Sequence, residues 1–320
     1  MKIDPRHLMQ LSAIVEAGGL TEAAVLMGTS QPAISRMLAA LEARLGQPLF
    51  LRDRRPLQPT DLGRALAEQG DAIRLATRRG MEAADALKRG DRGTVRFGGT
   101  PFFTDSLISG MVADFHLTHP NVRVDQRYGY TGELKSLVKS GRLDLAICPV
   151  ELLEPGDEDL IFEELLPGRN VVACRVGHPL LANGVLSSSA LLAYPWIEPP
   201  PGSALIADLR STLLALGARH VSVVYTGGSL TSLVNHLTAS DSLTILPYSV
   251  VFALKNEKRI AAIPLDLGHP PRSLAILRSE VSPTPASATR FVEHIKAAFL
   301  ELRRQIRQQE RATDWSRIES

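Results

Sequence analysis

The stretch Ser30-Gln31-Pro32-Ala33-Ile34-Ser35-Arg36 lies between two helical patterns and is typical of the first turns of a DNA-recognition helix. Pro32 suits the first turn of a helix, where a missing N–H costs little. Ile34 and the leucines that follow it at helical spacing predict a buried face. The opposite face would enter the major groove, where Gln can read adenine and Arg can read guanine. The residues expected to contact DNA here are Thr29, Ser30, Gln31, Pro32, Ser35 and Arg36.

The residues before this stretch predict the rest of a helix-turn-helix. An apolar stripe over residues 8–15 indicates a first helix that ends at Gly18-Gly19. Thr21 is suited to cap a short second helix over residues 22–27, and Ser30 to cap the third. Gly28-Thr29 makes the turn between them. The spacing therefore predicts three short helices in the order that a helix-turn-helix requires.

The residues after the third helix predict a basic wing. Leu49 to Leu51 read as a short strand, and Arg52, Arg54 and Arg55 follow in a turn. Arginines placed beside a major-groove helix suit phosphate or minor-groove contact. The alternative is that three arginines in a turn form only a solvated surface.

A long helix follows, from a cap at Thr60 to about Lys88. Small and apolar residues recur along it at spacings of three and four, which predicts a narrow seam. We expect this seam to pack against a second copy of the chain, because no local segment is evident that would cover it. Two recognition helices would then read half-sites about 34 Å apart. The alternative is a linker that packs within one chain. The seam residues are Leu62, Ala65, Leu66, Gln69, Ala72 and Ala76.

Residues 1–90 resemble the winged helix-turn-helix and linker helix of LysR-type transcriptional regulators. The matching motifs are Ala23-Ala24, Ser30 to Arg36, Leu41-Glu42, Leu45-Gly46, Leu49-Phe50 and Leu57-x-x-Thr60-x-x-Gly63. The resemblance implies promoter DNA as a partner, a homo-oligomer (dimer or tetramer), and a periplasmic-binding-protein-like effector domain. The chain also resembles the branch of galactose-binding-protein regulators, which implies a sugar as effector, with a small organic acid as second choice.

The composition is that of an ordinary globular protein, with 44% hydrophobic and 22% charged residues. Residues 1–92 carry 14 Lys and Arg against 11 Asp and Glu, so the basic excess lies in the predicted DNA-binding part. The sequence has no signal-like start and no apolar run of the ~20 residues that span a bilayer, which predicts a cytoplasmic protein. Its two cysteines, Cys148 and Cys174, fit a reducing compartment.

Alternating strand and helix patterns after Gly93 predict an α/β domain with a mainly parallel sheet. The predicted organisation is a DNA-binding domain over 1–60, a linker helix over 61–92 and a two-lobed effector domain over 93–320. Lobe I would take about 93–162 and 268–300, and lobe II about 163–267. Two such lobes joined by two crossings form a cleft that suits a small ligand.

Polar residues at the starts of predicted helices are the candidate effector contacts. Free N–H groups and the helix dipole favour a carboxylate or a polarised hydroxyl at such positions. In the LysR-type family the first two of these loops commonly touch the effector. The alternative is that each Thr or Ser only caps its helix. The candidates are Thr100, Pro101, Thr131, Gly132, Ser203 and Ser229.

One segment departs from the family pattern, and a few other residues allow more than one interpretation. Ala239-Ser240-Asp241-Ser242 replaces a segment that is Gly-rich in many members, which could alter the pocket edge. Phe102-Phe103 could stack on a ligand, although core packing is the simpler interpretation. His116 and His119 lack an evident third metal ligand. Residues 301–320 mix five Arg with four acidic residues, which predicts a solvated, fraying helix end that could touch a neighbouring subunit.

The sequence therefore predicts a regulator of transcription, activator or repressor, that binds double-stranded promoter DNA and can contact RNA polymerase. No motif of a hydrolase, metalloprotease or P-loop enzyme is present, so we expect no catalytic residues, no metal and no cofactor. Two alternatives stay open. One is an enzyme or solute-binding module with an incidental N-terminal bundle. The other is a sequence-indifferent, nucleoid-type DNA binder with strong salt dependence.

Overall fold

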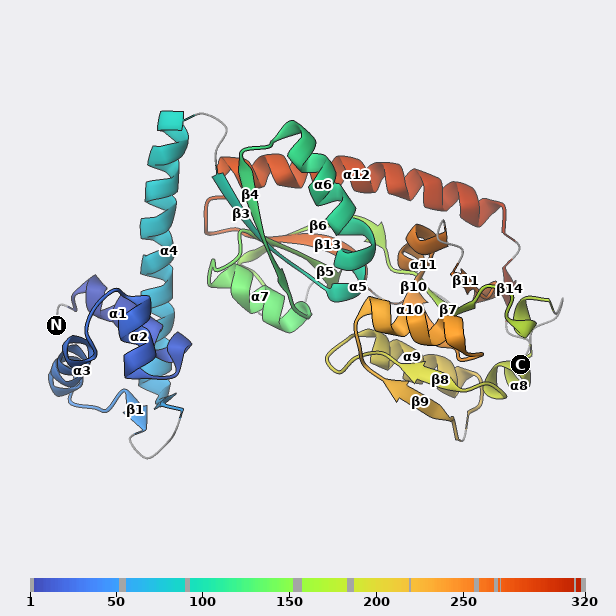
Figure 1. The fold of residues 1–320 in the computed structure, drawn as a ribbon, viewed down its shortest axis with the longest axis horizontal. Helices are drawn as coiled ribbons and strands as arrows, with labels where there is room; N and C mark the ends of the chain where they lie inside the picture. The colour runs from blue at the N-terminus through green and yellow to red at the C-terminus, as the bar shows by residue number, and fades with distance from the viewer. Residues whose placement is uncertain are drawn as a thin grey trace. The chain divides into compact units, whose positions relative to one another are not determined.

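The computed structural model describes residues 3–51, 56–89, 93–151, 157–182, 187–218, 220–255, 259–267, 270, 272–313 and 315–317. The chain divides into two compact units. The first comprises mainly residues 1–90, and the second comprises residues 91–139 and 143–320. Figure 1 labels the helices and strands of both units.

The N-terminal unit is a winged helix-turn-helix followed by a long helix. Its elements are α1 Pro5–Ala17, α2 Leu20–Leu26, α3 Gln31–Leu45, β1 Phe50–Leu51, β2 Gln58–Pro59 and α4 Asp61–Arg89. Leu11, Ile14, Ile34 and Leu41 are fully or almost fully buried in one small core. The strands β1 and β2 pair antiparallel as the base of the wing. The predicted helix-turn-helix order is therefore confirmed.

The caps of these helices agree with the prediction in part. Gly18 ends α1 in the left-handed conformation, with φ of 70°, as expected for a glycine at this position. The second helix begins at Leu20 with Gly19 as its N-cap, so the predicted cap at Thr21 is wrong. Ser30 does occupy the N-cap position of α3, but its side chain makes no capping hydrogen bond.

Several motif residues meet where the wing joins α4. The Glu42 Oε1 atom accepts a hydrogen bond from the Leu49 N–H at 2.7 Å. The Thr60 hydroxyl donates to the Pro48 carbonyl at 3.0 Å and accepts from the Gly63 N–H at 3.1 Å, so it caps α4 as predicted. A Cβ on Gly63 would lie 2.1 Å from the Leu49 carbonyl oxygen, which leaves room only for glycine. These contacts give a physical reason for the spacing of the motif.

The long helix α4 has a local partner, contrary to the expectation that nothing nearby would cover it. Its first half packs against α1, and a Cβ on Gly70 would lie 1.9 Å from the Leu8 carbonyl oxygen. Buried Asp71 accepts a hydrogen bond from the Ser12 hydroxyl across the same contact. Of the predicted seam, Leu62 and Leu66 pack on the domain core, whereas Ala65, Gln69, Ala72 and Ala76 stay exposed.

Lobe I of the second unit is a five-stranded sheet with helices on both faces (Figure 1). Its elements are β3 Gly93–Gly99, α5 Pro101–Phe103, the π-helical turn η1 Thr104–Ile108, α6 Ser109–Thr118, β4 Val122–Tyr128, α7 Thr131–Lys139, β5 Leu145–Val150, β6 Leu160–Pro167, β13 Ser273–Ser279 and α12 Ala286–Arg311. The strand order is β4-β3-β5-β13-β6, with β13 antiparallel to both neighbours. Alternate residues of β5 enter different cores, because Leu145 and Ile147 join the large core while Ala146 and Cys148 join a smaller one.

Lobe II contains the remaining elements. They are β7 Asn170–Arg175, the 3₁₀ turn η2 Pro179–Leu181, α8 Ser188–Leu192, β8 Trp196–Glu198, α9 Leu205–Ala215, β9 Val223–Thr226, α10 Leu230–Ala239, β10 Thr244–Pro247, α11 Tyr248–Leu254, β11 Ile260–Ala262, β12 Leu265–Asp266 and β14 Ser316–Arg317. Strand β7 is central and pairs antiparallel with β10 and β11. Strands β8 and β9 pair in parallel, and a single bridge joins Trp196 to Leu243. The predicted mainly parallel pairing is therefore correct for β3, β4 and β5 of lobe I and for β8 and β9 of lobe II. It is wrong for β13 and β7, each of which pairs antiparallel with both of its neighbours.

Two boundaries differ from the sequence prediction. Strand β6 stays in the lobe I sheet to Pro167, so the chain leaves lobe I after that residue rather than near Glu163. The C-terminal part of α12 does not fray. It continues to Arg311, buries Ile306, and is followed by β14, which pairs with β12. Polar composition alone suggested a solvated end, and it missed the apolar anchors Ile306 and Trp315.

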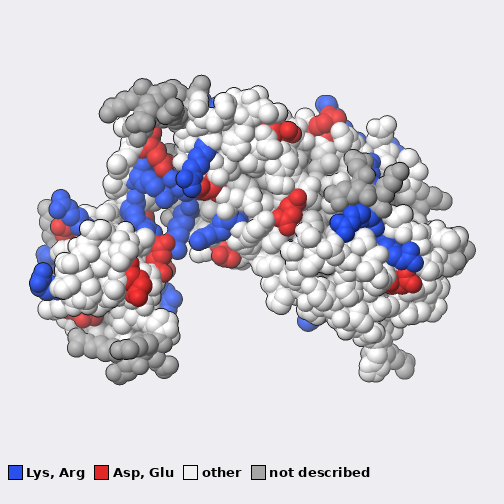
Figure 2. All heavy atoms as spheres, in the orientation of Figure 1, with Lys and Arg blue, Asp and Glu red and all other residues white. Residues whose placement is uncertain are grey.

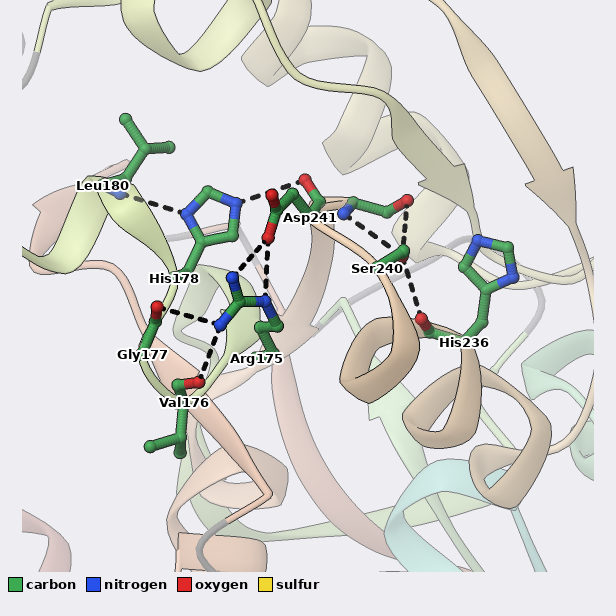
Figure 3. Close-up of polar contacts among 9 residues, drawn as sticks. Arg175, Val176, Gly177, His178, Leu180, His236, Ser240 and Asp241 are labelled. Carbon is green, nitrogen blue, oxygen red and sulfur yellow. Dashed lines mark hydrogen bonds and ion pairs between the residues drawn. The ribbon is translucent and has the colours of Figure 1, made fainter.

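The segment Ala239–Ser242, which departs from the Gly-rich family pattern, is held by polar contacts on lobe II (Figure 3). The Arg175 Nε atom donates to the Asp241 carboxylate at 2.8 Å, and its Nη1 atom donates to the carbonyls of Val176 and Gly177. The His178 Nδ1 atom accepts from the Leu180 N–H, so its Nε2 atom carries the proton and donates to the Asp241 carbonyl at 3.2 Å. These side chains fix the turn between α10 and β10 without glycine.

Candidate functional site

The first candidate site is the N-terminal end of α3. Gln31, Pro32 and Arg36 are exposed there, together with Thr29 and Ser30 in the preceding turn. Ser35 is partly buried. The apolar side of the same helix is locked into the core by Ile34, so the exposed side is held in a defined direction. The structure thus brings the predicted contact residues of this helix onto one accessible end.

The first turn of α3 has no side-chain cap. The Ser30 hydroxyl makes no capping bond, and the Ala33 and Ile34 N–H groups donate instead to the Ser30 carbonyl at 3.0 and 3.2 Å. Pro32 has no N–H. The first turn of α3 is therefore satisfied by backbone contacts, which leaves the Ser30 hydroxyl uncommitted at the exposed end of the helix.

The wing beside α3 is the third part of this candidate site. Its paired strands β1 and β2 are described, but Arg52, Arg54 and Arg55 lie outside the described residues. In the view of Figure 2 the N-terminal unit carries basic side chains along α4 and at its outer edge, with acidic side chains between them. On this face, basic and acidic side chains are therefore mixed rather than gathered into one basic patch.

The second candidate site is a pocket of about 750 Å³ in the second unit. It lies between the lobes, because residues of α5, α7 and β13 line it from lobe I and residues of β7, α9 and α11 line it from lobe II. A volume of this size accommodates a small metabolite. Of the six predicted effector contacts, five line it: Thr100, Pro101, Thr131, Gly132 and Ser203.

Thr100 is the most informative of these residues. Its side chain is buried, with 7% of the residue exposed, and its hydroxyl has no hydrogen-bond partner among the described residues. Its carbonyl accepts a hydrogen bond from the Thr104 hydroxyl at 2.9 Å, within the π-helical turn that follows. A buried hydroxyl without a partner costs free energy unless a ligand or water satisfies it. Thr100 is therefore a residue of the pocket wall whose buried hydroxyl is unsatisfied by the described residues.

The other predicted residues are used differently. The Thr131 hydroxyl donates to the Pro149 carbonyl at 2.8 Å, and the Ser203 hydroxyl accepts from the Leu205 N–H at 3.3 Å. Both hydroxyls retain acceptor capacity toward the pocket. Ser229 does not line this pocket; its hydroxyl accepts from the Ser232 N–H at 3.2 Å and caps α10. For Ser229 the structure shows the capping role that the sequence left as the alternative.

Charged residues of the pocket were missed by the sequence analysis. The Arg272 Nη2 atom donates to Asp208 Oδ1 at 2.7 Å, and the Asn170 amide donates to Asp208 Oδ2 at 2.7 Å. Burial raises the pKa of Asp208 above its ordinary value, while Arg272 and Asn170 act in the opposite direction. This cluster ties Arg272, which directly precedes β13 of lobe I, to α9 and β7 of lobe II within the pocket lining.

A second group surrounds Arg169. The Arg169 guanidinium donates to the Glu310 carboxylate at 2.9 Å and lies 4.0 Å from the ring centroid of Trp315 and 5.6 Å from that of Tyr248. Burial, with a smaller contribution from nearby Glu310, raises the pKa of Tyr248, and burial raises that of Tyr130. Both phenols therefore stay protonated at neutral pH and can donate hydrogen bonds.

The other residues that the sequence singled out have structural roles in the described part of the chain. Phe102 and Phe103 line the pocket but are buried in the core, at 5% and 8% exposure. The His116 ring bonds to the Val122 carbonyl and the His119 ring to the Thr118 hydroxyl, and the described residues contain no group of three potential metal ligands. Burial raises the pKa of the Cys174 thiol to about 12, which leaves it unreactive.

Comparison with known proteins agrees with this geometry. Residues 5–64 match the bacterial regulatory helix-turn-helix protein of the lysR family, and residues 88–300 match the LysR substrate binding domain. The chain is 29% identical to the HTH-type transcriptional regulator GbpR of Rhizobium radiobacter over 66% of this chain and 70% of that one. It is 26% identical to the transcriptional activator protein LysR of Escherichia coli over 94% of each.

The fold is also that of a solved LysR-family structure. Full-length CbnR in complex with its target DNA superposes with a TM-score of 0.63 at 20% identity, over 92% of this chain and 100% of that one. No helix in the described part of the chain has the length and apolarity needed to cross a membrane. The family consists of transcriptional regulators rather than enzymes. This chain belongs to the LysR family of DNA-binding transcriptional regulators, and it carries both the helix-turn-helix and the effector-binding domain of that family.

Proposed function

We propose that this chain controls transcription by a small metabolite that binds in the pocket between the two lobes and alters its hold on promoter DNA. The observation that carries the proposal is the buried, unpartnered hydroxyl of Thr100 on the wall of a pocket that both lobes form. The proposed effector contacts are Thr100, Pro101, Thr131, Gly132 and Ser203.

A ligand with a carboxylate suits this pocket better than a neutral sugar. Five arginines and two acidic residues are among its described lining residues. Both acids are engaged, Asp208 by Arg272 and Glu310 by Arg169. The positive excess that remains favours an anion. We therefore place an organic acid, including an acid derived from a sugar, ahead of the neutral sugar that the resemblance implied. GbpR and LysR are similarly distant relatives, so their identities do not favour one branch.

The DNA side of the proposal rests on the N-terminal unit. Gln31 and Arg36 read bases, and Thr29, Ser30, Pro32 and Ser35 position the helix. The wing residues Arg52, Arg54 and Arg55 are assigned to the DNA backbone from the sequence. A dimer or tetramer sets the spacing of the half-sites, and the exposed alanines of α4 offer a contact for a second copy. Closure of the lobes around the effector changes how subunits pack and hence how the DNA is bent.

The experiment that tests this function is DNA footprinting of the full chain on the region upstream of its own gene, at fixed salt. We expect a discrete footprint whose extent or bend changes with one carboxylate and not with random metabolites. Equal binding to random DNA would support the nucleoid-type alternative. Ligand binding without any specific footprint would support a solute-binding module. Either result rejects the proposed function.

Replacing Thr100 by valine tests the effector contact. We expect the free energy of unfolding to change by less than about 1 kcal/mol, because the lost hydroxyl has no protein partner. Effector affinity should fall about tenfold, which is the size of one hydrogen bond to a charged group. Thermal unfolding and isothermal calorimetry measure the two effects. Ser229→Ala is the matched control, since its hydroxyl caps α10 away from the pocket lining and its loss should leave affinity unchanged.

A further inference from the structure

The C-terminal segment from Glu301 to Arg317 is set apart by its position in the sequence. The LysR substrate binding domain is matched to residue 300, whereas α12 continues to Arg311 and β14 follows it. The segment therefore extends beyond the part of the chain that the family domain accounts for. Its contacts show where it lies.

Helix α12 begins on lobe I and ends against lobe II. Near its start, the Phe291 ring lies 5.4 Å from Phe97 and 5.2 Å from Phe115, both in lobe I. Near its end, Glu310 forms the 2.9 Å ion pair with Arg169, which directly precedes the first strand of lobe II. Figure 1 shows this long helix crossing lobe I and the chain then descending to β14 in lobe II. One rigid helix thus spans the two lobes.

A cluster of side chains fastens the end of this helix. The Trp315 ring stacks on the Arg169 guanidinium at 4.0 Å and meets the Tyr248 ring edge-on at 5.4 Å. Strand β14 then pairs in parallel with β12 of lobe II, with Leu265 opposite Ser316. We call Arg169, Tyr248, Glu310 and Trp315 the clasp. Because Arg169, Tyr248 and Glu310 also line the pocket, the clasp is part of its wall.

The same segment places a positive charge on the pocket that has no partner among the described residues. Arg303, Ile306 and Arg307 line the pocket from α12. Arg303 pairs with Glu164 at 3.4 Å, whereas Arg307 has no ion pair or hydrogen bond among the described residues. Each of the other lining arginines has a carboxylate within 4.0 Å. Among the described lining residues, Arg307 is therefore the arginine that no carboxylate pairs, and it is exposed to solvent.

We propose that the C-terminal segment is part of the effector site: Arg307 binds the carboxylate of the effector, and the clasp holds this wall of the pocket against lobe II. The proposal rests on the proposed function, since it names residues of the same pocket. Arg307 selects the ligand by charge. Arg169, Glu310 and Trp315 act as positioning residues that hold the C-terminal end of α12. Any movement of lobe II relative to lobe I therefore has to displace that end of the helix.

Arg307→Gln tests the charge, and Arg304→Gln is its matched control. Arg304 lies on the same helix, is 72% exposed and does not line the pocket. The probes are succinate, citrate, gluconate and benzoate, with glucose and galactose as neutral compounds, measured by calorimetry on the full chain. We expect at least one carboxylate to bind, with a 10- to 100-fold weaker affinity in Arg307→Gln and a change below about twofold in Arg304→Gln. Equal losses in both variants, or none in Arg307→Gln, would overturn the role of Arg307.

The clasp is tested without any ligand, through tryptophan fluorescence. The chain has two tryptophans, of which Trp196 is fully buried. The Trp315→Phe variant reports the emission of Trp196 alone, and subtracting that emission from the wild-type spectrum gives the emission of Trp315. We expect Glu310→Gln to shift the Trp315 emission to longer wavelength and to increase its quenching by acrylamide. Glu301→Gln, on the exposed side of α12, should have no such effect. Unchanged Trp315 emission in Glu310→Gln would overturn the clasp.

The outcomes separate this inference from the proposed function. If neutral sugars bind and no carboxylate does, Arg307 has been assigned wrongly while the pocket remains the effector site. If neither class binds and the DNA footprint responds to none of the probes, the proposed function and the role of Arg307 both fail. The fluorescence result decides the clasp in either case, because it requires no effector.

Discussion

Replacing Gly70 by alanine should destabilise the N-terminal unit by about 2–3 kcal/mol, the usual cost of forcing extra volume into a closely packed site. An added Cβ would lie 1.9 Å from the Leu8 carbonyl oxygen and 2.4 Å from the Leu8 carbonyl carbon. Both are backbone atoms of α1, so no side chain can turn away to make room. The helices α1 and α4 would have to separate, which would also loosen the contact between Ser12 and Asp71. Differential scanning calorimetry of the full chain should show the loss in the transition of the N-terminal unit.

Gly80→Ala is the matched control for this substitution. Gly80 lies in the same helix, and beyond its own helical turn no described residue comes within 4 Å of an added Cβ. Alanine there should stabilise the helix by about 0.5–1 kcal/mol, because glycine loses more backbone entropy on folding. The two glycines should therefore give effects of opposite sign. If both substitutions stabilised the chain, the close approach of α4 to α1 would be wrong.

Replacing Arg36 by alanine should lower the affinity for the specific DNA site roughly 5- to 150-fold, the range of one good side-chain contact to a base. Arg36 is exposed near Gln31 at the accessible end of α3, and no hydrogen bond or ion pair joins its side chain to another described residue. We therefore expect unchanged thermal stability. Fluorescence anisotropy with the footprinted promoter fragment and with random DNA measures the specific and nonspecific affinities.

Arg36→Lys separates the two ways in which Arg36 can bind DNA. Lysine keeps the charge for a phosphate but loses the planar pair of donors that fits guanine. If Arg36 reads a base, lysine should weaken specific binding nearly as much as alanine and leave random DNA unaffected. If it contacts only phosphate, lysine should behave like the wild type, and alanine should reduce the salt slope by about one. Full retention of specific affinity in Arg36→Ala would contradict any role in recognition.

Predictions from the sequence were most accurate for features that depend on residues close to one another in the chain. The residue spacing around Ser30 to Arg36 was enough to predict three helices, the turn between the second and third, and the exposed recognition face. Helix periodicity and helix caps act over only one or two turns, so a short stretch of sequence contains the necessary information. The prediction failed at Thr21, where Gly19 begins the helix two residues earlier. Thr100, Thr131 and Ser203 were found in the same way, as polar residues that follow strands and precede helices.

The charged residues of the pocket could not be found by such reasoning. Arg169 and Glu310 are 141 residues apart, and Asp208 and Arg272 are 64 residues apart. The sequence around each of these residues gives no sign of which distant residue will be its partner. The polar C-terminal segment likewise suggested a frayed end, because its composition does not show that Ile306 and Trp315 meet an apolar surface on the lobes.

The sequence by itself determined the helix-turn-helix, the two-lobed α/β class and the membership of a regulator family, since these follow from local periodicity and contiguous motifs. Only the tertiary structure decided which side of α4 packs on α1, which polar residues face the pocket, and where α12 ends. Those features depend on the distance between segments far apart in the chain, and that distance is set by the packing of the whole unit rather than by any local pattern.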